Sequence, residues 1–263
     1  MTDLPARRTV RSYEARNAWR PLVSEEMTKI FTTRAERYPE PTGADTALGA
    51  SRAVLAAVPV LGGSITEVLS MVLAPAVARR RDEWLKELAN GLDAVERQVE
   101  GFKIEDLAND DAFVSAVIDA SRSAVSTHRD EKRTALRNAL LNIALHRSTD
   151  EDQQQMFLRY IDELTVWHIR ILELFRDPPK YLAAKGVGNN YYMGSASQVL
   201  EDVYPEMKGQ KELYDQIASD LGSRGLVNSA TFLHGMMSAQ GMVSKRTTPL
   251  ADRFLDFITN PLL

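Results

Sequence analysis

The sequence contains no cysteine, and this absence excludes several kinds of chemistry at once. Disulfides, thiolate nucleophiles, zinc ribbons and cysteine-ligated iron–sulfur clusters all require that residue. A chain of 263 residues can bury roughly 70–75% of its unfolded surface, so its core needs no covalent cross-link. The absence fits a reducing compartment, and we expect a cytoplasmic protein.

Histidine is scarce, and the sequence lacks the common catalytic motifs. No histidine pair forms the His-Glu-x-x-His pattern of a zinc-binding helix among His128, His146, His168 and His234. Phosphate-loop and nucleophile-elbow patterns are absent, and the glycine spacing after Lys185 does not match a dinucleotide fingerprint. We therefore predict no catalytic, cofactor-binding or metal-ligating residues, and we expect that the protein is not an enzyme.

Two features admit both a functional and a structural interpretation. His168 beside Trp167 suits a pH-sensitive site, but a histidine near a helix start is more often structural. The acidic runs at Asp110-Asp111 and at residues 150–152 are candidate metal ligands. Both runs fall at expected helix starts, where carboxylates interact favourably with the helix dipole, so the structural interpretation is favoured.

No strong excess of positive charge is present either. The net charge is −4, and the pI is about 5.7. From residue 148 onward, 11 lysines and arginines face 15 aspartates and glutamates. This balance provides no global basic field that would draw the protein to DNA or to anionic lipid. The first residues also lack the apolar region of a secretory signal.

The most apolar stretch is residues 47–77, from Ala47 to Val77, which we predict to form a helical hairpin. Proline and paired glycines in Pro59-Val-Leu-Gly-Gly63 interrupt it. Ser64 and Glu67 form a capping-box pattern for the second arm. Each arm has about 14 residues, or about 21 Å of helix, against about 30 Å for the hydrocarbon core of a bilayer. We expect Pro75 and the following arginines to end the segment.

Two interpretations of this hairpin stay open, and the first is favoured. In one, Leu61, Ile65, Leu69 and Val72 belong to a buried core. In the other, the hairpin contacts a membrane or forms oligomers, because its small residues allow close helix approach and Arg79-Arg80-Arg81 suits lipid headgroups. Glu67 opposes the second interpretation, since a carboxylate is costly in lipid.

Amphipathic periodicity predicts helices along most of the remaining chain. A helix over residues 82–102 has one apolar stripe, formed by Leu85, Leu88, Leu92, Val95 and Val99. Two further helices are expected around Phe113 and around Leu136. Ser148 and Glu151 predict a capping box for the next helix, and Thr165 is the expected cap of a helix closed by Asp177-Pro-Pro179.

Beyond the turn-rich residues 185–194, the pattern predicts two helices and a short strand. The helices are expected at residues 195–203 and 210–224, with Gly225 in the C′ position. The spacing of Phe232, Leu233, Met236 and Met237 favours another helix. A strand is expected at residues 242–246, and Thr248-Pro249 should start the last helix. We predict an all-α or nearly all-α fold, divided into an N-terminal extension (1–43), a helical bundle with the hairpin (44–147) and a C-terminal domain (148–263).

The order of elements after Thr165 resembles a winged-helix domain. The matching segments are Ile171-Leu-Glu-Leu-Phe175, the helix after Ser195, the helix ending at Gly225, and the closing Thr247-Thr-Pro-Leu-Ala251. This resemblance implies a winged-helix-like C-terminal domain. A DNA-recognition helix needs lysine or arginine for phosphates, whereas residues 210–224 contain Lys211 and Arg224 against Glu212, Asp215 and Asp220. Nucleic-acid binding is therefore the less favoured hypothesis.

The whole chain resembles a group of uncharacterised bacterial helical proteins and, more loosely, the abortive-infection alpha type. The shared features are Pro59-Val-Leu-Gly-Gly63, the arginine-rich approach to Trp84, and residues 157–175. This similarity implies a stress or phage-defence role without catalytic residues. The leading hypothesis is a non-enzymatic interaction protein that acts through protein contacts, through self-association, or through a membrane contact of the hairpin. The alternative is a winged-helix transcriptional regulator that binds DNA.

Overall fold

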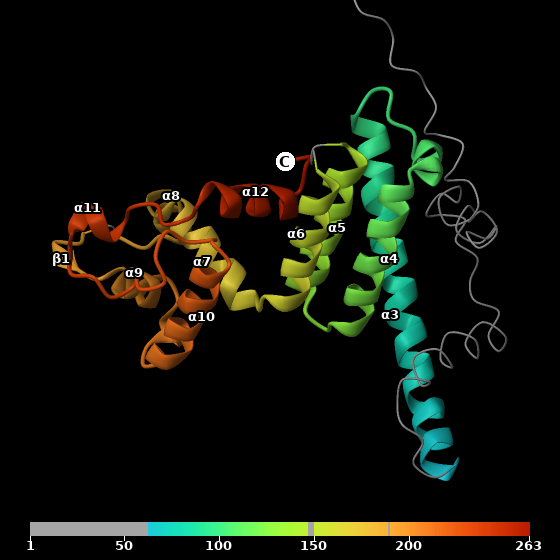
Figure 1. The fold of residues 1–263 in the computed structure, drawn as a ribbon, viewed down its shortest axis with the longest axis horizontal. Helices are drawn as coiled ribbons and strands as arrows, with labels where there is room; N and C mark the ends of the chain where they lie inside the picture. The colour runs from blue at the N-terminus through green and yellow to red at the C-terminus, as the bar shows by residue number, and fades with distance from the viewer. Residues whose placement is uncertain (1–62, 147–149, 189) are drawn as a thin grey trace, which may run out of the picture.

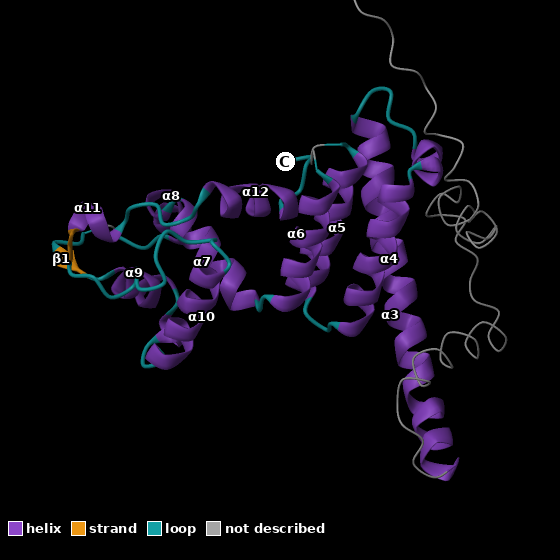
Figure 2. Cartoon of the chain, in the orientation of Figure 1, coloured by secondary structure: helices purple, strands orange, loops and turns teal. Residues whose placement is uncertain are grey.

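The computed structural model describes residues 63–146, 150–188 and 190–263, with side chains from Leu69 onward. These residues are mostly helical, and β1 (Met193–Gly194) and β2 (Met237–Ser238) form a two-stranded sheet (Figures 1 and 2). The predicted all-α class is confirmed. The predicted N-terminal extension and the first arm of the hairpin lie outside the described residues.

Helix α3 (Gly63–Gln98) runs without interruption through the predicted boundary at Pro75 and the three arginines. The prediction that the apolar segment ends there, and that a separate helix starts at Asp82, was wrong. Proline in a helix removes one hydrogen bond and crowds the preceding turn. Pro75 is exposed, so water can reach the carbonyl that loses its partner. Ser64 lies within α3, which begins at Gly63. The side chains of Ser64 and Glu67, which were predicted to form a capping box, lie outside the described set.

The C-terminal half of α3 packs in a bundle with α4 (Asp111–Ser126), α5 (Asp130–Ala144) and α6 (Glu151–Glu163). Its buried side chains form one stripe at spacings of three and four: Trp84, Leu88, Leu92 and Val95. Leu88, Leu92 and Val95 were predicted, whereas Trp84 takes the buried position expected for Leu85, and Leu85 and Val99 are only partly buried. The Trp84 indole also donates a hydrogen bond of 2.8 Å to Ser121 Oγ on α4. A short 3₁₀ helix, η3 (Ile104–Asn109), connects α3 to α4.

Carboxylates cap both bundle helices whose starts contain the acidic runs. Asp110 Oδ1 accepts hydrogen bonds from the backbone N–H groups of Ala112 and Phe113 at 3.0 Å. Asp150 caps α6 by accepting from the Asp152 N–H group at 3.2 Å. The predicted cap at Ser148 was therefore wrong, since α6 starts two residues later than expected. Aspartate and serine are equally suited to the cap position, so the sequence alone did not distinguish them. The structural interpretation of the acidic runs is supported.

The C-terminal unit contains α7–α11, and its helix bounds largely follow the sequence pattern. Gly225, at φ 68°, follows the end of α10 as predicted. Asp177 both ends α7 and caps a helix that the sequence analysis missed, because Pro178 and Pro179 occupy its first turn. The helices are α7 (Val166–Arg176), α8 (Pro178–Lys185), α9 (Ala196–Val203), η4 (Pro205–Met207), α10 (Lys211–Ser223) and α11 (Ala239–Met242).

The predicted strand at residues 242–246 was wrong, and so was the helix expected around Met236. Met237 instead lies in β2, which pairs antiparallel with β1, and α11 follows directly. Residues 242–246 turn back toward α7, where the Arg246 N–H group donates to the Phe175 carbonyl at 2.8 Å. A Cβ atom at Gly241 would lie 2.9 Å from Met237 Cβ, so this turn requires glycine.

The last helix, α12 (Pro249–Ile258), lies between the bundle and the C-terminal unit and packs on α5 and α7 (Figure 1). Two buried asparagines of α5 bind its last carbonyl groups. Asn138 Nδ2 donates to the Ile258 carbonyl at 2.9 Å, and Asn142 Nδ2 donates to those of Phe257 and Thr259 at 2.9 and 2.8 Å. Side-chain amides thus satisfy the helix end where intrahelical partners are missing.

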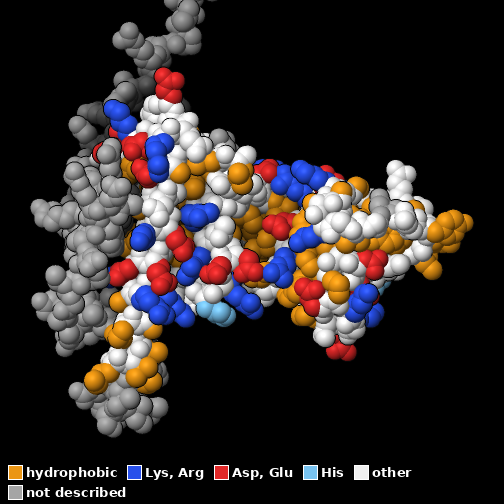
Figure 3. Space-filling view, turned by 180° about the vertical axis from the view of Figure 1, so that it is seen from behind, with side chains coloured by type: hydrophobic (Ala, Val, Ile, Leu, Met, Phe, Trp, Pro, Cys, Tyr) orange, Lys and Arg blue, Asp and Glu red, His pale blue; other side chains and the backbone are white. Residues whose placement is uncertain are grey.

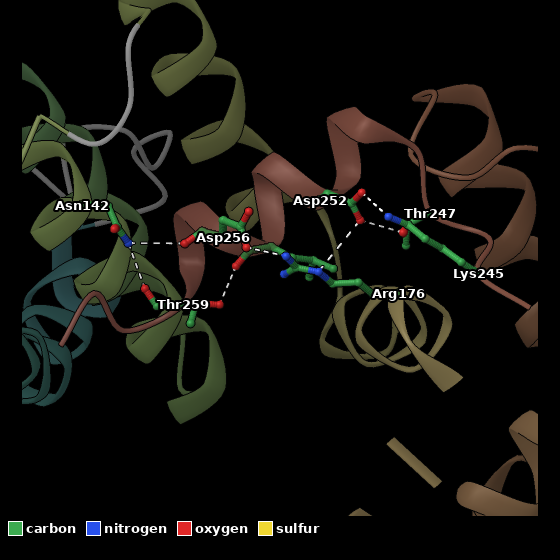
Figure 4. Close-up of polar contacts among 8 residues, drawn as sticks. Asn142, Arg176, Lys245, Thr247, Asp252, Asp256 and Thr259 are labelled. Atoms are coloured by element: carbon green, nitrogen blue, oxygen red, sulfur yellow. Dashed lines mark hydrogen bonds and ion pairs between the residues drawn. The ribbon is translucent and has the colours of Figure 1, made fainter. Parts of the chain in front are cut away.

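Charged side chains hold the other side of α12 to α7 and to the loop before it (Figure 4). Arg176 on α7 forms ion pairs with Asp256 at 2.6 Å and with Asp252 at 3.9 Å. Asp252 also accepts a hydrogen bond of 2.8 Å from Thr247 and pairs with Lys245. The two sets of contacts place α12 as the connection between the two parts of the molecule.

We predict that Asn142→Ala lowers the free energy of unfolding by about 1–3 kcal/mol, because it leaves buried carbonyl groups of α12 without donors. Urea denaturation followed by circular dichroism measures this difference. Asn90→Ala on the exposed face of α3 is the matched control and should change stability by less than about 0.5 kcal/mol. Equal midpoints for wild type and Asn142→Ala would contradict the role assigned to this amide.

Candidate interaction surface

The N-terminal half of α3 extends beyond the bundle and exposes large apolar side chains (Figure 1). The exposed fractions are 43% for Leu69, 75% for Met71, 65% for Val72 and 46% for Leu73. We call these four residues the α3 tip. The favoured prediction that Leu69 and Val72 belong to a buried core was wrong, because the helix that carries them continues past its bundle partners. Leu61 and the Ile65 side chain lie outside the described set.

The α3 tip differs in its angular distribution from the buried stripe of the same helix. Successive residues of an α-helix are about 100° apart, so the four tip positions cover an arc of about 200°. By the same geometry, Trp84, Leu88, Leu92 and Val95 fall within about 80°. The buried stripe suits packing against neighbouring helices, whereas the tip is apolar around more than half of its circumference. In the space-filling view, hydrophobic side chains gather on this protruding segment (Figure 3).

Three arginines follow the tip along α3, where the helix reaches the end of α4, and we call Arg79, Arg80 and Arg81 the arginine run. Their intramolecular contacts are long. Arg79 lies 3.7 Å from Glu83, Arg80 lies 3.4 Å from the Val125 carbonyl, and Arg81 lies 3.4 Å from Asp82. Partly exposed pairs of this kind contribute about 0–1 kcal/mol, so the guanidinium groups can be redirected at little cost.

A second set of exposed apolar side chains surrounds the small sheet at the far end of the C-terminal unit. Tyr192 is 88% exposed, Met193 58% and Met236 78%. The sequence pattern predicted a turn-rich connection for the first two and a helix for Met236. The pairing of β1 with β2 brings these residues together, although more than 40 positions separate them in the sequence.

A groove of about 880 Å³ lies between the bundle and the C-terminal unit. Its walls combine cations and carboxylates, including Arg137, Arg170, Glu131 and Glu173. Arg170 pairs with Glu131 at 3.0 Å, and burial raises the pKa of Glu173. Among the described residues, no group of three or more histidine or carboxylate side chains is arranged to hold a metal ion. The groove therefore offers mixed charges without a defined reactive set.

His168 is buried at the start of α7, where it completes the cap of that helix. Its Nδ1 accepts a hydrogen bond from the Thr165 N–H group at 3.2 Å, and Nε2 lies 3.5 Å from Asp220 on α10. The neutral tautomer thus has its hydrogen on Nε2, facing the carboxylate. Burial lowers the pKa of His168, while Asp220 opposes this effect and Arg224 and Lys132 add to it. These contacts support the structural interpretation of His168.

The cations of α10, the helix that a winged-helix domain would use to recognise DNA, and of its C-cap are paired within the protein. Lys211 pairs with Asp215 at 2.6 Å, and Arg224 pairs with Glu163 of α6 at 2.6 Å. Gln216 donates a hydrogen bond to Asp220. Glu212, Asp215 and Asp220 leave this helix with more carboxylates than cations. Phosphates need unpaired cations, which the described contacts of α10 do not supply.

Comparisons of the chain with protein families, with characterised proteins and with solved structures find no match. No helix among the described residues is long and apolar enough to cross a bilayer. The α3 tip with its arginine run is thus the candidate site with the clearest physical chemistry, since it places an apolar surface next to available cations.

We predict that Leu69→Asp leaves the melting temperature within a few degrees of wild type, because Leu69 is 43% exposed and the new carboxylate can reach water. Leu88→Asp, about five turns further along the same helix, should unfold the protein, since Leu88 is only 2% exposed and an isolated buried carboxylate costs several kcal/mol. Thermal melts of the two variants measure this contrast. Unfolding by Leu69→Asp would restore the core interpretation.

A second prediction concerns pH. The pKa of His168 is lower in the folded protein, so protonation favours the unfolded chain, and stability is lost as pH falls through the unfolded value of about 6.5. Glutamine at this position does not titrate and can still accept the Thr165 N–H group. Urea titrations across pH 5–8 should therefore show wild type losing stability relative to His168→Gln below about pH 6.5. Parallel pH profiles would refute the linkage.

Proposed function

We propose that this protein is a non-enzymatic interaction protein whose contact surface is the α3 tip. The observation that carries the proposal is the exposure of four large apolar side chains on one segment that projects from the bundle. Single exposed apolar residues are common on soluble proteins, but contiguous groups mark sites of association. The rest of the described chain carries this surface.

The energetic argument follows from the rest of α3. Beyond Asp82 the helix buries its apolar stripe in the bundle, but the tip has no comparable cover among the described residues. Transfer of apolar surface from water is worth about 25 cal/mol per Å², so covering the tip with a partner is favourable. Association is thus the simplest reason to keep this surface apolar.

The setting of this function is proposed from resemblance. Similarity to abortive-infection alpha-type proteins favours a bacterial stress or phage-defence component, and the lack of cysteine favours the cytoplasm. The alternative proposal, a winged-helix regulator, is supported by the order of α7, α9 and α10 and by the small sheet. The ion pairs of Lys211 and Arg224 count against it, because they occupy the cations of the helix that would contact DNA.

Fractionation of native-level cell extracts tests the proposal. We expect wild type to sediment with assemblies or membranes larger than its own 29.4 kDa, and the tip variant Met71→Ser/Val72→Ser/Leu73→Ser to sediment as a monomer. Ile118→Ser is the matched control, because Ile118 is a 47% exposed apolar residue on α4. Circular dichroism should show equal helix content for all three proteins.

Two outcomes contradict the proposal. In one, the wild-type protein sediments only as a monomer. In the other, the tip variant sediments in the same large assemblies as the wild type. A sequence-specific DNA complex at physiological salt, tighter than about 10⁻⁸ M, would support the regulator instead.

A further inference from the structure

We propose that the partner of the α3 tip is the surface of an anionic lipid bilayer, with the arginine run against lipid phosphates. This inference rests on the proposed function, because it names what the same surface binds. The inference rests on three features of α3: the shape of its apolar surface, the cations that follow this surface, and the distance between the two.

The shape of the apolar surface favours a bilayer. A partner helix contacts a stripe about 100° wide, as the buried residues of α3 do within the bundle. The α3 tip covers about 200°, so one packed helix or the same face of a second copy would leave much of it in water. Acyl chains can surround the end of a helix and cover the whole arc.

The position of the arginines agrees with this partner. Arg79 lies ten residues after Leu69, which corresponds to about 15 Å along the helix and to about half of the hydrocarbon core of a bilayer. A helix that lies obliquely in the near leaflet can therefore place the α3 tip among acyl chains while the arginine run reaches the headgroups. Basic residues immediately outside an inserted segment bind anionic lipids in this way.

The charges near the arginine run are arranged to allow this contact. Asp82 and Glu83, its carboxylate neighbours, follow it on the bundle side and lie away from the tip. Arg79 has 74% of its side chain exposed, and within the described part of the chain the 3.7 Å contact to Glu83 holds it. The guanidinium group can therefore exchange this carboxylate for a lipid phosphate.

The depth of the contact is limited to one leaflet. The sequence before the tip includes Glu67, and a carboxylate is costly in hydrocarbon. No described helix is long and apolar enough to span a bilayer. The proposed contact is therefore peripheral: the body of the protein stays in water, and the α3 tip enters the near leaflet at a shallow angle that keeps Glu67 out of the hydrocarbon.

Flotation of the purified full-length protein with vesicles tests this inference. We compare vesicles of phosphatidylcholine alone with vesicles that also contain phosphatidylglycerol. Wild type should bind the anionic vesicles at least about tenfold more strongly than the neutral ones, and added salt should weaken that binding. The tip variant Met71→Ser/Val72→Ser/Leu73→Ser should lose binding to both, and Ile118→Ser should bind like wild type.

The contribution of the arginine run is separated by charge-matched variants. Arg79→Gln/Arg80→Gln/Arg81→Gln should lose the preference for anionic vesicles. Arg97→Gln/Arg122→Gln/Lys211→Gln removes the same number of exposed cations elsewhere and should keep that preference. Equal loss in both variants would show that net charge alone governs binding and would overturn the role of the run.

Failure of this inference can be told apart from failure of the proposed function. If wild type does not float with any vesicle but its sedimentation in extracts still depends on the tip, the partner is a protein and the membrane inference is wrong. If sedimentation does not depend on the tip either, both proposals are wrong. Equal binding to neutral and anionic vesicles would also overturn the anionic-lipid inference.

Discussion

The arrangement of the two parts of the molecule depends on the hydrogen bonds from two buried asparagines of α5 to the end of α12. Asn138 and Asn142 donate to the carbonyl groups of residues 257–259, which have no partners within their own helix. A buried carbonyl without a donor costs about 1–3 kcal/mol, so these amides fix where α12 ends and which face it turns to the bundle. Because α12 also packs on α7, the C-terminal unit takes its place relative to the bundle through this helix.

The ion pairs of Arg176 complement these amides from the opposite side. Arg176 pairs with Asp252 and Asp256 of α12 (Figure 4). The bundle thus holds α12 through its backbone carbonyls, and the C-terminal unit holds it through its carboxylates. The carboxylates of Asp252 and Asp256 are partly exposed, and pairs of that kind contribute little on their own. Their main effect is therefore on the orientation of α12, while the buried amides contribute more of the stability.

Against this body, the α3 tip is a part of the described chain where large apolar side chains remain exposed on one projecting segment. The same helix contains a narrow buried stripe and a broad exposed apolar arc, and the arginine run lies between them. The first half of the helix is suited to a partner that can surround it, and the second half anchors it in the bundle. This division within one helix is the physical basis of both the proposed association and its proposed lipid partner. The groove beside Glu173 and the exposed residues around β1 and β2 lack a comparable pairing of apolar surface with available charge.

The sequence by itself determined the helical class, most helix positions and several helix ends, because these depend on interactions between residues a few positions apart. The stripe at Leu88, Leu92 and Val95, the carboxylate cap at Asp110 and the left-handed Gly225 all follow from local spacing and local backbone preference. The absence of recognised catalytic motifs was also a property of the sequence alone, and it shaped the functional hypothesis.

Tertiary structure alone decided which of these local elements are covered. Leu69 and Leu88 are equally apolar and lie on one helix that packs on α4 and α5, but Leu88 is 2% exposed and Leu69 is 43% exposed. Asn142 looks in sequence like an ordinary helix-surface amide, and its role arises because the end of the chain, more than 110 residues later, returns to it. The two-residue strands likewise exist only because β1 and β2 meet in space. Burial and pairing depend on contacts between distant segments, whereas periodicity and capping report only on nearby residues, and this is why the sequence predicted the helices but not the exposed end of α3.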